Sequence, residues 1–189
     1  LLRRGIAEGS EAFFYLENDL RYAHNPFLFA NMEDAVDRIL DAREEGEKVL
    51  IFGDRDVDGI TAVTVLYEAL SDLGIPVTWR IPTGDDPYGL SFEAIDAHDA
   101  ENGTLIITVD CGISNVEEVA YAAEKGIDVI VIDHHTPQEK LPDAAVIINC
   151  KMPDSGYPHT HLSGCATAWK VVTAVRFGLL DIYKQQICL

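Results

Sequence analysis

Carboxylate and imidazole side chains gather at three places in this sequence, each directly after a short apolar run. The three groups are Asp54-x-Asp56-x-Asp58, Asp110 and Asp133-His134-His135. Carboxylates and imidazoles together are good ligands for divalent cations such as Mn²⁺, and carboxylates alone suit Mg²⁺. Apolar runs of this length are typical of buried parallel strands, and open parallel sheets bind ligands at the carboxyl ends of their strands. The pattern therefore predicts a metal site at the open edge of an α/β sheet.

The first group places three carboxylates at alternate positions in a turn. Without cations, such close packing of Asp54, Asp56 and Asp58 would be electrostatically unfavourable. An EF-hand loop begins in a similar way, but it requires Glu at loop position 12, where this chain has Val65. A solvated acidic turn is the other alternative to a cation site.

The second and third groups strengthen this interpretation. Asp110 alone could be a helix cap, but it is the second of three strand ends that carry an Asp. His134 and His135 are adjacent and point in different directions, so one can bind a metal while the other reaches a phosphate. The neighbouring carboxylate of Asp133 can orient an imidazole.

Helix and strand signals alternate along most of the chain, in the rhythm of a right-handed βαβ array. The expected helices span 31–45, 59–73, 91–100, 114–125 and 164–177, and the expected strands span 48–52, 77–81, 104–109, 128–132 and 145–148. Ser114 and Glu117 have the spacing of a capping box. We expect an α/β domain over 31–189, with a parallel β-sheet and helices on both faces, after a helical lead-in over 1–30.

Composition limits the classes of function. The 189 residues include 14 basic and 32 acidic side chains, for a net charge of −18, so this segment has no overall basic patch for a phosphate backbone. No apolar run approaches the length of a membrane helix. The chain starts with Leu1 rather than Met, and we expect it to be part of a longer protein. The four cysteines are Cys111, Cys150, Cys165 and Cys188; their spacing favours free thiols in a reducing cytoplasm.

The segment before the last expected helix offers possible substrate contacts. Ser163 and Gly164 begin that helix, where backbone N–H groups can bind an anion. His159 and His161 belong either to a substrate loop or to an exposed loop without such a role.

Three motifs carry a family resemblance. They are Gly53-Asp54-Arg55-Asp56-Val57-Asp58-Gly59-Ile60-Thr61, Thr108-Val109-Asp110-Cys111-Gly112-Ile113-Ser114 and Asp133-His134-His135. They resemble the first three motifs of the DHH phosphoesterase superfamily, and are most similar to its RecJ branch, the bacterial single-strand-specific 5′→3′ DNA exonucleases. Similarity to this branch extends over Asn25-Pro26-Phe27-Leu28, Met32-Glu33-Asp34-Ala35, Tyr88-Gly89-Leu90-Ser91 and the stretch 157–164.

The resemblance implies a metal-dependent phosphodiesterase that degrades single-stranded DNA in recombination and repair. It implies a DHH-type fold with two Mn²⁺ or Mg²⁺ ions, surrounded by Asp54, Asp56, Asp58, Asp110 and His134. It makes His135 the contact to the scissile phosphate and Asp133 a support for the ligands. The other expected substrate-binding residues are His161, Ser163 and Gly164. The implied partners are single-stranded DNA, held mostly by domains outside this chain, and a single-strand-binding protein or helicase, in the cytoplasm and not at a membrane.

The chain departs from the family pattern in several places. Some relatives carry His where Phe52 stands, Arg55 replaces a more usual aromatic residue, and Cys165-Ala166 replaces a more Gly-rich pair. The chain also stops before the fourth family motif, which holds a further metal-binding Asp, so the activity of this chain alone is left open. Two alternatives stand beside the exonuclease. One is a DHH enzyme for short oligonucleotides, cyclic dinucleotides or pyrophosphate, and the other is a non-catalytic RecJ-like scaffold.

Overall fold

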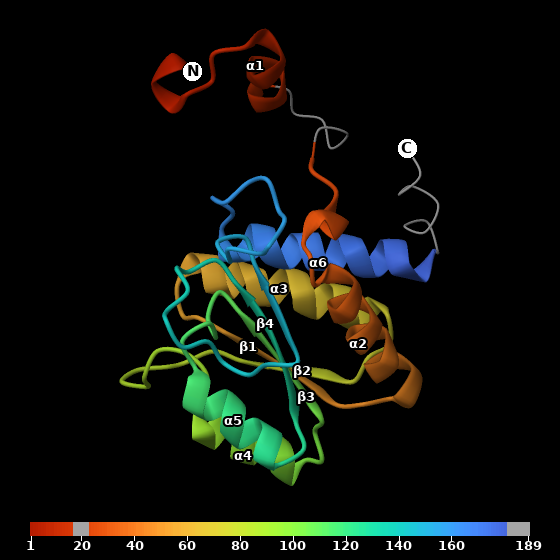
Figure 1. Cartoon of the computed structure of the whole chain (residues 1–189). Coiled ribbons are helices and arrows are strands. Elements are labelled where there is room, and N and C mark those ends of the chain that lie inside the picture. Colours follow the sequence, from red (N-terminus) through yellow and green to blue (C-terminus); the bar gives the residue numbers. More distant parts are fainter. Residues whose placement is uncertain (17–22, 181–189) are drawn as a thin grey trace.

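A computed structural model describes residues 1–16 and 23–180 of the chain (Figure 1). The expected lead-in over 1–30 and the expected domain over 31–189 therefore lie partly outside the described residues, at 17–22 and 181–189. The described part of the lead-in contains the short helices η1 (Leu2–Arg4), α1 (Gly9–Leu16) and η3 (Pro26–Leu28). No helix in the described ranges is both long and apolar enough to span a bilayer.

The core of the fold is a five-stranded parallel sheet with the strand order β2-β1-β3-β4-β5. The strands are β1 (Val49–Gly53), β2 (Val77–Arg80), β3 (Leu105–Val109), β4 (Asp128–Asp133) and β5 (Val146–Asn149). Every residue of β1 and β3 is buried, as expected for strands covered on both faces. The predicted parallel α/β sheet is therefore confirmed.

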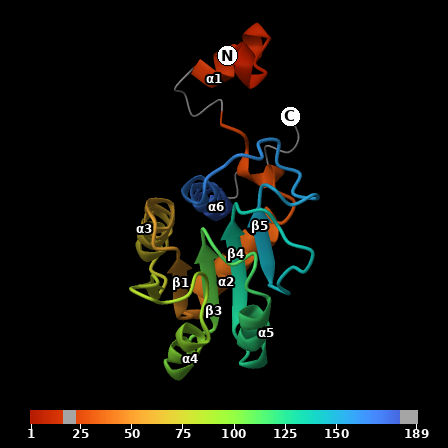
Figure 2. The same ribbon diagram turned by 90° about the vertical axis from the view of Figure 1, so that its left-hand side faces the viewer.

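Helices cover both faces of this sheet (Figure 2). On one face lie α2 (Met32–Glu45), α3 (Val57–Asp72) and α6 (Gly164–Leu179), and on the other lie α4 (Phe92–Ala100) and α5 (Val116–Glu124). Alternation along β1 divides the core, since Ile51 packs with the first group of helices and Phe52 with the second. Burial of each such side chain contributes about 1.5–3 kcal/mol to folding.

Two helix starts differ from the sequence expectation. Helix α3 begins at Val57, two residues earlier than predicted, because Asp56 caps it by accepting a hydrogen bond from the Gly59 N–H at 2.9 Å. The predicted capping box at Ser114 and Glu117 is wrong. Asn115 is the N-cap of α5 and makes no side-chain cap bond, because its amide instead binds both backbone groups of Leu90.

The strand register aligns the three ligand-bearing segments. Gly53 of β1 pairs with Val109 of β3, which in turn pairs with Ile132 of β4. The residue that follows each of these is Asp54, Asp110 or Asp133, so the three carboxylates leave the sheet at the same level. After β1 the chain crosses to β2 on one side, and β3 returns on the other side. This reversal is the switch point at which open α/β sheets form ligand sites.

Candidate metal centre

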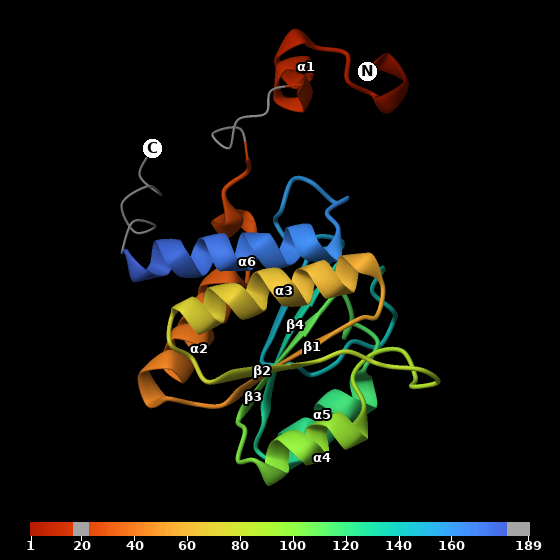
Figure 3. The same ribbon diagram turned by 180° about the vertical axis from the view of Figure 1, so that it is seen from behind.

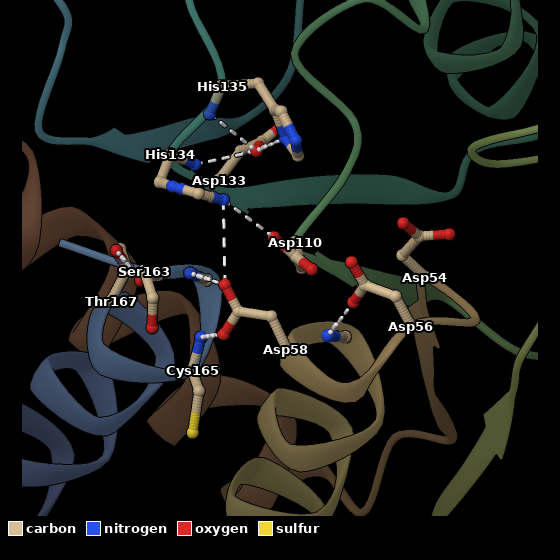
Figure 4. Close-up of polar contacts among 12 residues, drawn as sticks. Asp54, Asp56, Asp58, Asp110, Asp133, His134, His135, Ser163, Cys165 and Thr167 are labelled. Atoms are coloured by element: carbon tan, nitrogen blue, oxygen red, sulfur yellow. Dashed lines mark hydrogen bonds and ion pairs between the residues drawn. The ribbon is translucent and has the colours of Figure 1, made fainter. Parts of the chain in front are cut away.

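The three predicted clusters meet at the carboxyl edge of β1, β3 and β4 (Figure 4). Ligand atoms of Asp54, Asp56 and Asp110 lie within 4.8 Å of one another, and so do those of Asp110, His134 and His135. Asp110 belongs to both groups. The structure thus joins carboxylates and imidazoles from three distant segments around one shared aspartate.

The loop that carries Asp54 and Asp56 is held tightly at its base. A Cβ atom on Gly59 would lie 2.5 Å from the Asp54 carbonyl oxygen, so only glycine permits this close approach. Asp54 accepts a hydrogen bond from the Arg55 N–H at 2.7 Å, and Asp56 uses one oxygen to cap α3. Each carboxylate is therefore fixed by a backbone hydrogen bond while it takes part in the group around Asp110.

Asp58 does not belong to either group. It lies in the first turn of α3, where its carboxylate turns toward the start of α6. Its oxygens accept hydrogen bonds from the Gly164 and Cys165 N–H groups, both at 2.8 Å. The sequence placed Asp58 with Asp54 and Asp56 as a ligand, whereas in the structure it bonds to α6.

Asp110 is the most unusual residue of the centre. Its side chain is almost fully buried, its backbone is left-handed with φ 58°, and its Oδ1 atom accepts no hydrogen bond. The His134 Nε2 atom lies 3.0 Å from that oxygen without completing a hydrogen bond to it. Burial, together with the charges of Asp58 and Asp56, raises the pKa of Asp110 to about 7. A buried carboxylate without a donor is unfavourable in the metal-free protein.

These features fit a divalent cation. The described residues record ion pairs from Asp110 and Asp58 to His134, but none from either aspartate to Lys or Arg. A cation beside Asp110 would satisfy the unpartnered oxygen and offset the neighbouring carboxylates. The donors are carboxylate oxygens with one or two imidazoles, a set that suits Mn²⁺ and, through its oxygens, Mg²⁺.

Asp133 orients the two histidines through hydrogen bonds to its carboxylate. It is fully buried and accepts hydrogen bonds from the His134 N–H at 2.6 Å, the His135 N–H at 3.0 Å and the Ile113 N–H at 3.0 Å. The His135 Nδ1 atom lies 2.7 Å from the same carboxylate, so Nδ1 is the donor to Asp133 and Nε2 is left for other partners. These contacts allow Asp133 to orient both histidines, and its supporting role beside a metal stays a prediction.

Tyr88 is a residue of the centre that sequence reasoning did not identify. Its hydroxyl donates to the Asp110 carbonyl oxygen at 3.2 Å and lies 3.3 Å from His135 Nδ1. Burial and the charge of Asp133 raise the pKa of Tyr88, so its hydroxyl stays protonated and remains a donor. The signal in the sequence was the Tyr88-Gly89-Leu90-Ser91 stretch, which is similar to the RecJ branch but does not by itself place Tyr88 beside Asp110.

The predicted substrate contacts near α6 have a different arrangement from the one expected. Ser163 caps α6 by accepting a hydrogen bond from the Ala166 N–H at 3.2 Å, and the Gly164 N–H binds Asp58. The anion at this helix start is thus a side chain of the protein itself. His161 is exposed and packs edge-on against His159 at 6.0 Å between ring centroids.

A large hollow of the described structure lies away from the acidic edge. It has a volume of about 640 Å³ between α3, α6 and residues 23–26, and Lys170 lines it. No member of the two groups around Asp110 lines this hollow. The candidate metal centre therefore lies apart from this hollow.

Comparison with known proteins gives a consistent result. Residues 48–187 match the family model described as the DHH family, N-terminal domain. The single-stranded-DNA-specific exonuclease RecJ of Bacillus subtilis is 36% identical over 182 residues, which cover 96% of this chain and 23% of that protein. RecJ of Escherichia coli is 38% identical over 154 residues, covering 80% of this chain and 27% of that protein. The chain spans about a quarter of the length of these relatives.

Solved structures show the same relationship. A crystal structure of exonuclease RecJ bound to manganese superimposes with a TM-score of 0.72 at 31% identity, covering 80% of this chain and 38% of that one. RecJ of Thermus thermophilus in complex with Mn²⁺ gives a TM-score of 0.67 at 30% identity, covering 82% of this chain and 22% of that one. Since the family model matches residues 48–187 of the 189, the chain belongs to the DHH family.

Proposed function

We propose that this chain is the metal-binding part of a phosphodiesterase, and that the whole protein is a 5′→3′ exonuclease for single-stranded DNA. The observation that carries the proposal is the buried Asp110, whose Oδ1 atom accepts no hydrogen bond and which is shared by two groups of ligand atoms. The RecJ relatives, which are exonucleases specific for single-stranded DNA, support the choice of substrate.

The residues divide the work at the centre. Asp54, Asp56, Asp110 and His134 would hold Mn²⁺ or Mg²⁺, and Asp110 belongs to both groups of ligand atoms. When bound, a pair of such ions activates water as a nucleophile and stabilises charge on the leaving oxygen. Asp133 orients the ring of His135 through Nδ1 and leaves Nε2 to face a scissile phosphate, and the Tyr88 hydroxyl lies beside the same ring. With a cation bound, the Asp110 oxygen that accepts no hydrogen bond would become a metal ligand.

The acidic balance of the chain supports a division of labour within the whole protein. With a net charge of −18, this segment has little electrostatic attraction for a DNA backbone. We assign most of the grip on DNA to parts outside this chain. A cytoplasmic location, which the free thiols of Cys111, Cys150 and Cys165 support, belongs to the same proposal. So does association with a single-strand-binding protein or a helicase.

The test is a nuclease assay on a longer protein that includes the region following this segment in the full-length relatives. We expect Mn²⁺-dependent release of nucleotides from the 5′ end of single-stranded DNA, and loss of that release in Asp110→Asn. Preferred cleavage of short oligonucleotides, cyclic dinucleotides or pyrophosphate would support another DHH enzyme. Binding of DNA without any metal-dependent cleavage would support the non-catalytic scaffold.

A further inference from the structure

Asp58 lies where three parts of the molecule meet: the first turn of α3, the start of α6 and His134 after β4 (Figure 4). Burial alone would raise its pKa, but hydrogen bonds from the Cys165 and Gly164 N–H groups lower the pKa below its usual value. The positive end of the α6 dipole favours the same anion. An internal carboxylate thus neutralises a helix terminus directly beside the metal centre.

The start of α6 also touches Asp110. A Cβ atom on Gly164 would lie 2.4 Å from Asp110 Oδ1 and 2.6 Å from its Cβ, so the helix backbone rests against the buried carboxylate. A displacement of this first turn would therefore displace Asp110 or open space beside it. Helices α3 and α6 lie side by side over one face of the sheet, which leaves little freedom for either to move alone (Figure 3).

His134 completes the contact. Its Nε2 atom lies 3.7 Å from Asp58 Oδ2 and 3.0 Å from Asp110 Oδ1. Asp58 therefore contacts His134 directly and is linked to Asp110 through the backbone of Gly164. Both of its oxygens are already engaged by backbone donors, unlike the unpartnered oxygen of Asp110.

We propose that Asp58 is a positioning residue of the metal centre and not one of its ligands: by anchoring the first turn of α6, it holds Asp110 and His134 in place to receive the ions. This inference rests on the metal centre of the proposed function. It separates the three alternate aspartates of the first motif into two ligands and one anchor.

Three substitutions test this role in the 189-residue chain. Asp58→Glu keeps the charge but lengthens the side chain, and Asp58→Asn keeps the length but removes the charge. The matched control is Asp34→Asn, which removes an exposed acid from the first turn of α2. Calorimetric titration with Mn²⁺ gives the number of bound ions and their Kd. Hydrogen exchange in the metal-free chain reports the α6 amides at 164–166.

We expect both Asp58 variants to bind as many ions as the parent, with a Kd raised about 10- to 100-fold. Exchange at 164–166 should be faster in both variants, and Asp34→Asn should match the parent in every measurement. If the Asp58 variants do not fold, Ser163→Ala provides a milder change, because it removes the side chain that caps the first turn of α6 beside Asp58. It should raise Kd less, and an unchanged Kd there would overturn the proposal.

Other outcomes overturn the proposal in distinguishable ways. Loss of a bound ion in both Asp58 variants would make Asp58 a ligand. Faster exchange with unchanged Kd would make it only a helix anchor. Weaker binding in Asp58→Asn but not in Asp58→Glu would reduce its role to charge. No Mn²⁺ binding by the parent chain would remove the proposed metal centre itself, whereas the other three results would leave that centre standing.

Discussion

Acidic clusters lie at both ends of the parallel strands, at their amino ends (the amino edge of the sheet) and at their carboxyl ends (the carboxyl edge). Among the described residues, Lys or Arg side chains neutralise only the cluster at the amino edge. At the amino edge, Arg38 binds Glu47 at 2.8 Å and Asp128 at 2.7 Å, and the Thr104 hydroxyl donates to Glu47. At the carboxyl edge, Asp110 has no Lys or Arg partner among the described residues, and its Oδ1 accepts no hydrogen bond.

The difference separates an acidic group that stabilises the fold from one kept for another purpose. Paired and hydrogen-bonded carboxylates, as at the amino edge, favour the folded state. A buried carboxylate oxygen that accepts no hydrogen bond opposes it, and such groups concentrate at functional sites. The contrast therefore predicts opposite responses to substitution at the two edges.

The largest effect is expected for Asp110→Asn. Mn²⁺ affinity should fall about 100-fold or more, because the residue shared by both ligand groups loses its charge. The metal-free variant should be more stable than the parent by about 1–3 kcal/mol at pH 8. Asn tolerates the left-handed backbone at this position. Calorimetric titration and urea unfolding in EDTA measure the two effects.

The gain in stability at Asp110→Asn should depend on pH. In the metal-free chain the pKa of Asp110 is raised from 3.8 to about 7, so the folded state binds more protons than the unfolded state between these values. Its contribution to the free energy of unfolding therefore falls as pH rises through this window, and the advantage of Asn should shrink toward pH 4. A variant less stable than the parent at pH 8 would break the contrast between the edges.

The next largest effect is expected for Gly164→Ala. The added Cβ would lie 2.4 Å from Asp110 Oδ1, so the helix or the carboxylate must shift. We expect a loss of about 1–3 kcal/mol in the free energy of unfolding from overpacking, together with weaker Mn²⁺ binding. Gly9→Ala is the control, because nothing lies within 4 Å of its added Cβ. Equal stability and affinity in both variants would mean that α6 does not constrain Asp110.

At the amino edge, we expect Glu47→Gln to cause a smaller decrease in the free energy of unfolding. Burial alone would raise the pKa of Glu47, but hydrogen bonds from Arg38 and Thr104 lower it below 4.5. The unfolded state therefore binds more protons just below pH 4.5, and this carboxylate stabilises the fold above that pH and loses its effect on acidification. The free energy of unfolding of the variant should be lower by about 1 kcal/mol at pH 7, discounted for partial exposure, and this difference should shrink as the pH falls below 4.5. Urea unfolding of both proteins across pH 3–7 checks this, and a constant difference would contradict the pairing.

The smallest effect is expected for Arg55→Ala. The Arg55 guanidinium donates to the Gly84 and Asp86 carbonyl oxygens at 2.8 and 2.9 Å, and so holds the loop that carries Tyr88. Hydrogen exchange of this loop should become faster, while the free energy of unfolding changes by less than about 0.5 kcal/mol. Arg43→Ala is the control, since Arg43 also binds a backbone carbonyl, that of Leu73, far along the chain from this loop. Unchanged exchange in Arg55→Ala would show that the guanidinium does not restrain the loop.

The sheet and the meeting of the three strand ends could be predicted from the sequence. Apolar runs such as 105–109, each followed by a charged residue, define both the strands and the edge that they share. The shared position of Asp54, Asp110 and Asp133 then follows from parallel register.

The separate roles within the first motif could not be predicted in the same way. Alternate spacing suggests convergence only if the backbone stays extended, but α3 begins at Val57 and turns Asp58 away from Asp54 and Asp56. The partner of Asp58 is Gly164, which lies 106 residues later, and no local pattern reports such a contact. The place of Tyr88 in the centre could not be predicted for the same reason, since its contacts to Asp110 and His135 are made only in the folded chain.

The strand order has a consequence for how this molecule assembles. Val49 pairs with both Val77 and Leu105, so β1 lies between β2 and β3, and the pairing of β1 with β3 spans the whole β2 crossover in the sequence. Closing such non-local pairings is slow compared with local helix formation. Asp54 and Asp110 are brought together by such a non-local pairing, so we expect a divalent ion that binds both to stabilise the assembled sheet and not its separate segments.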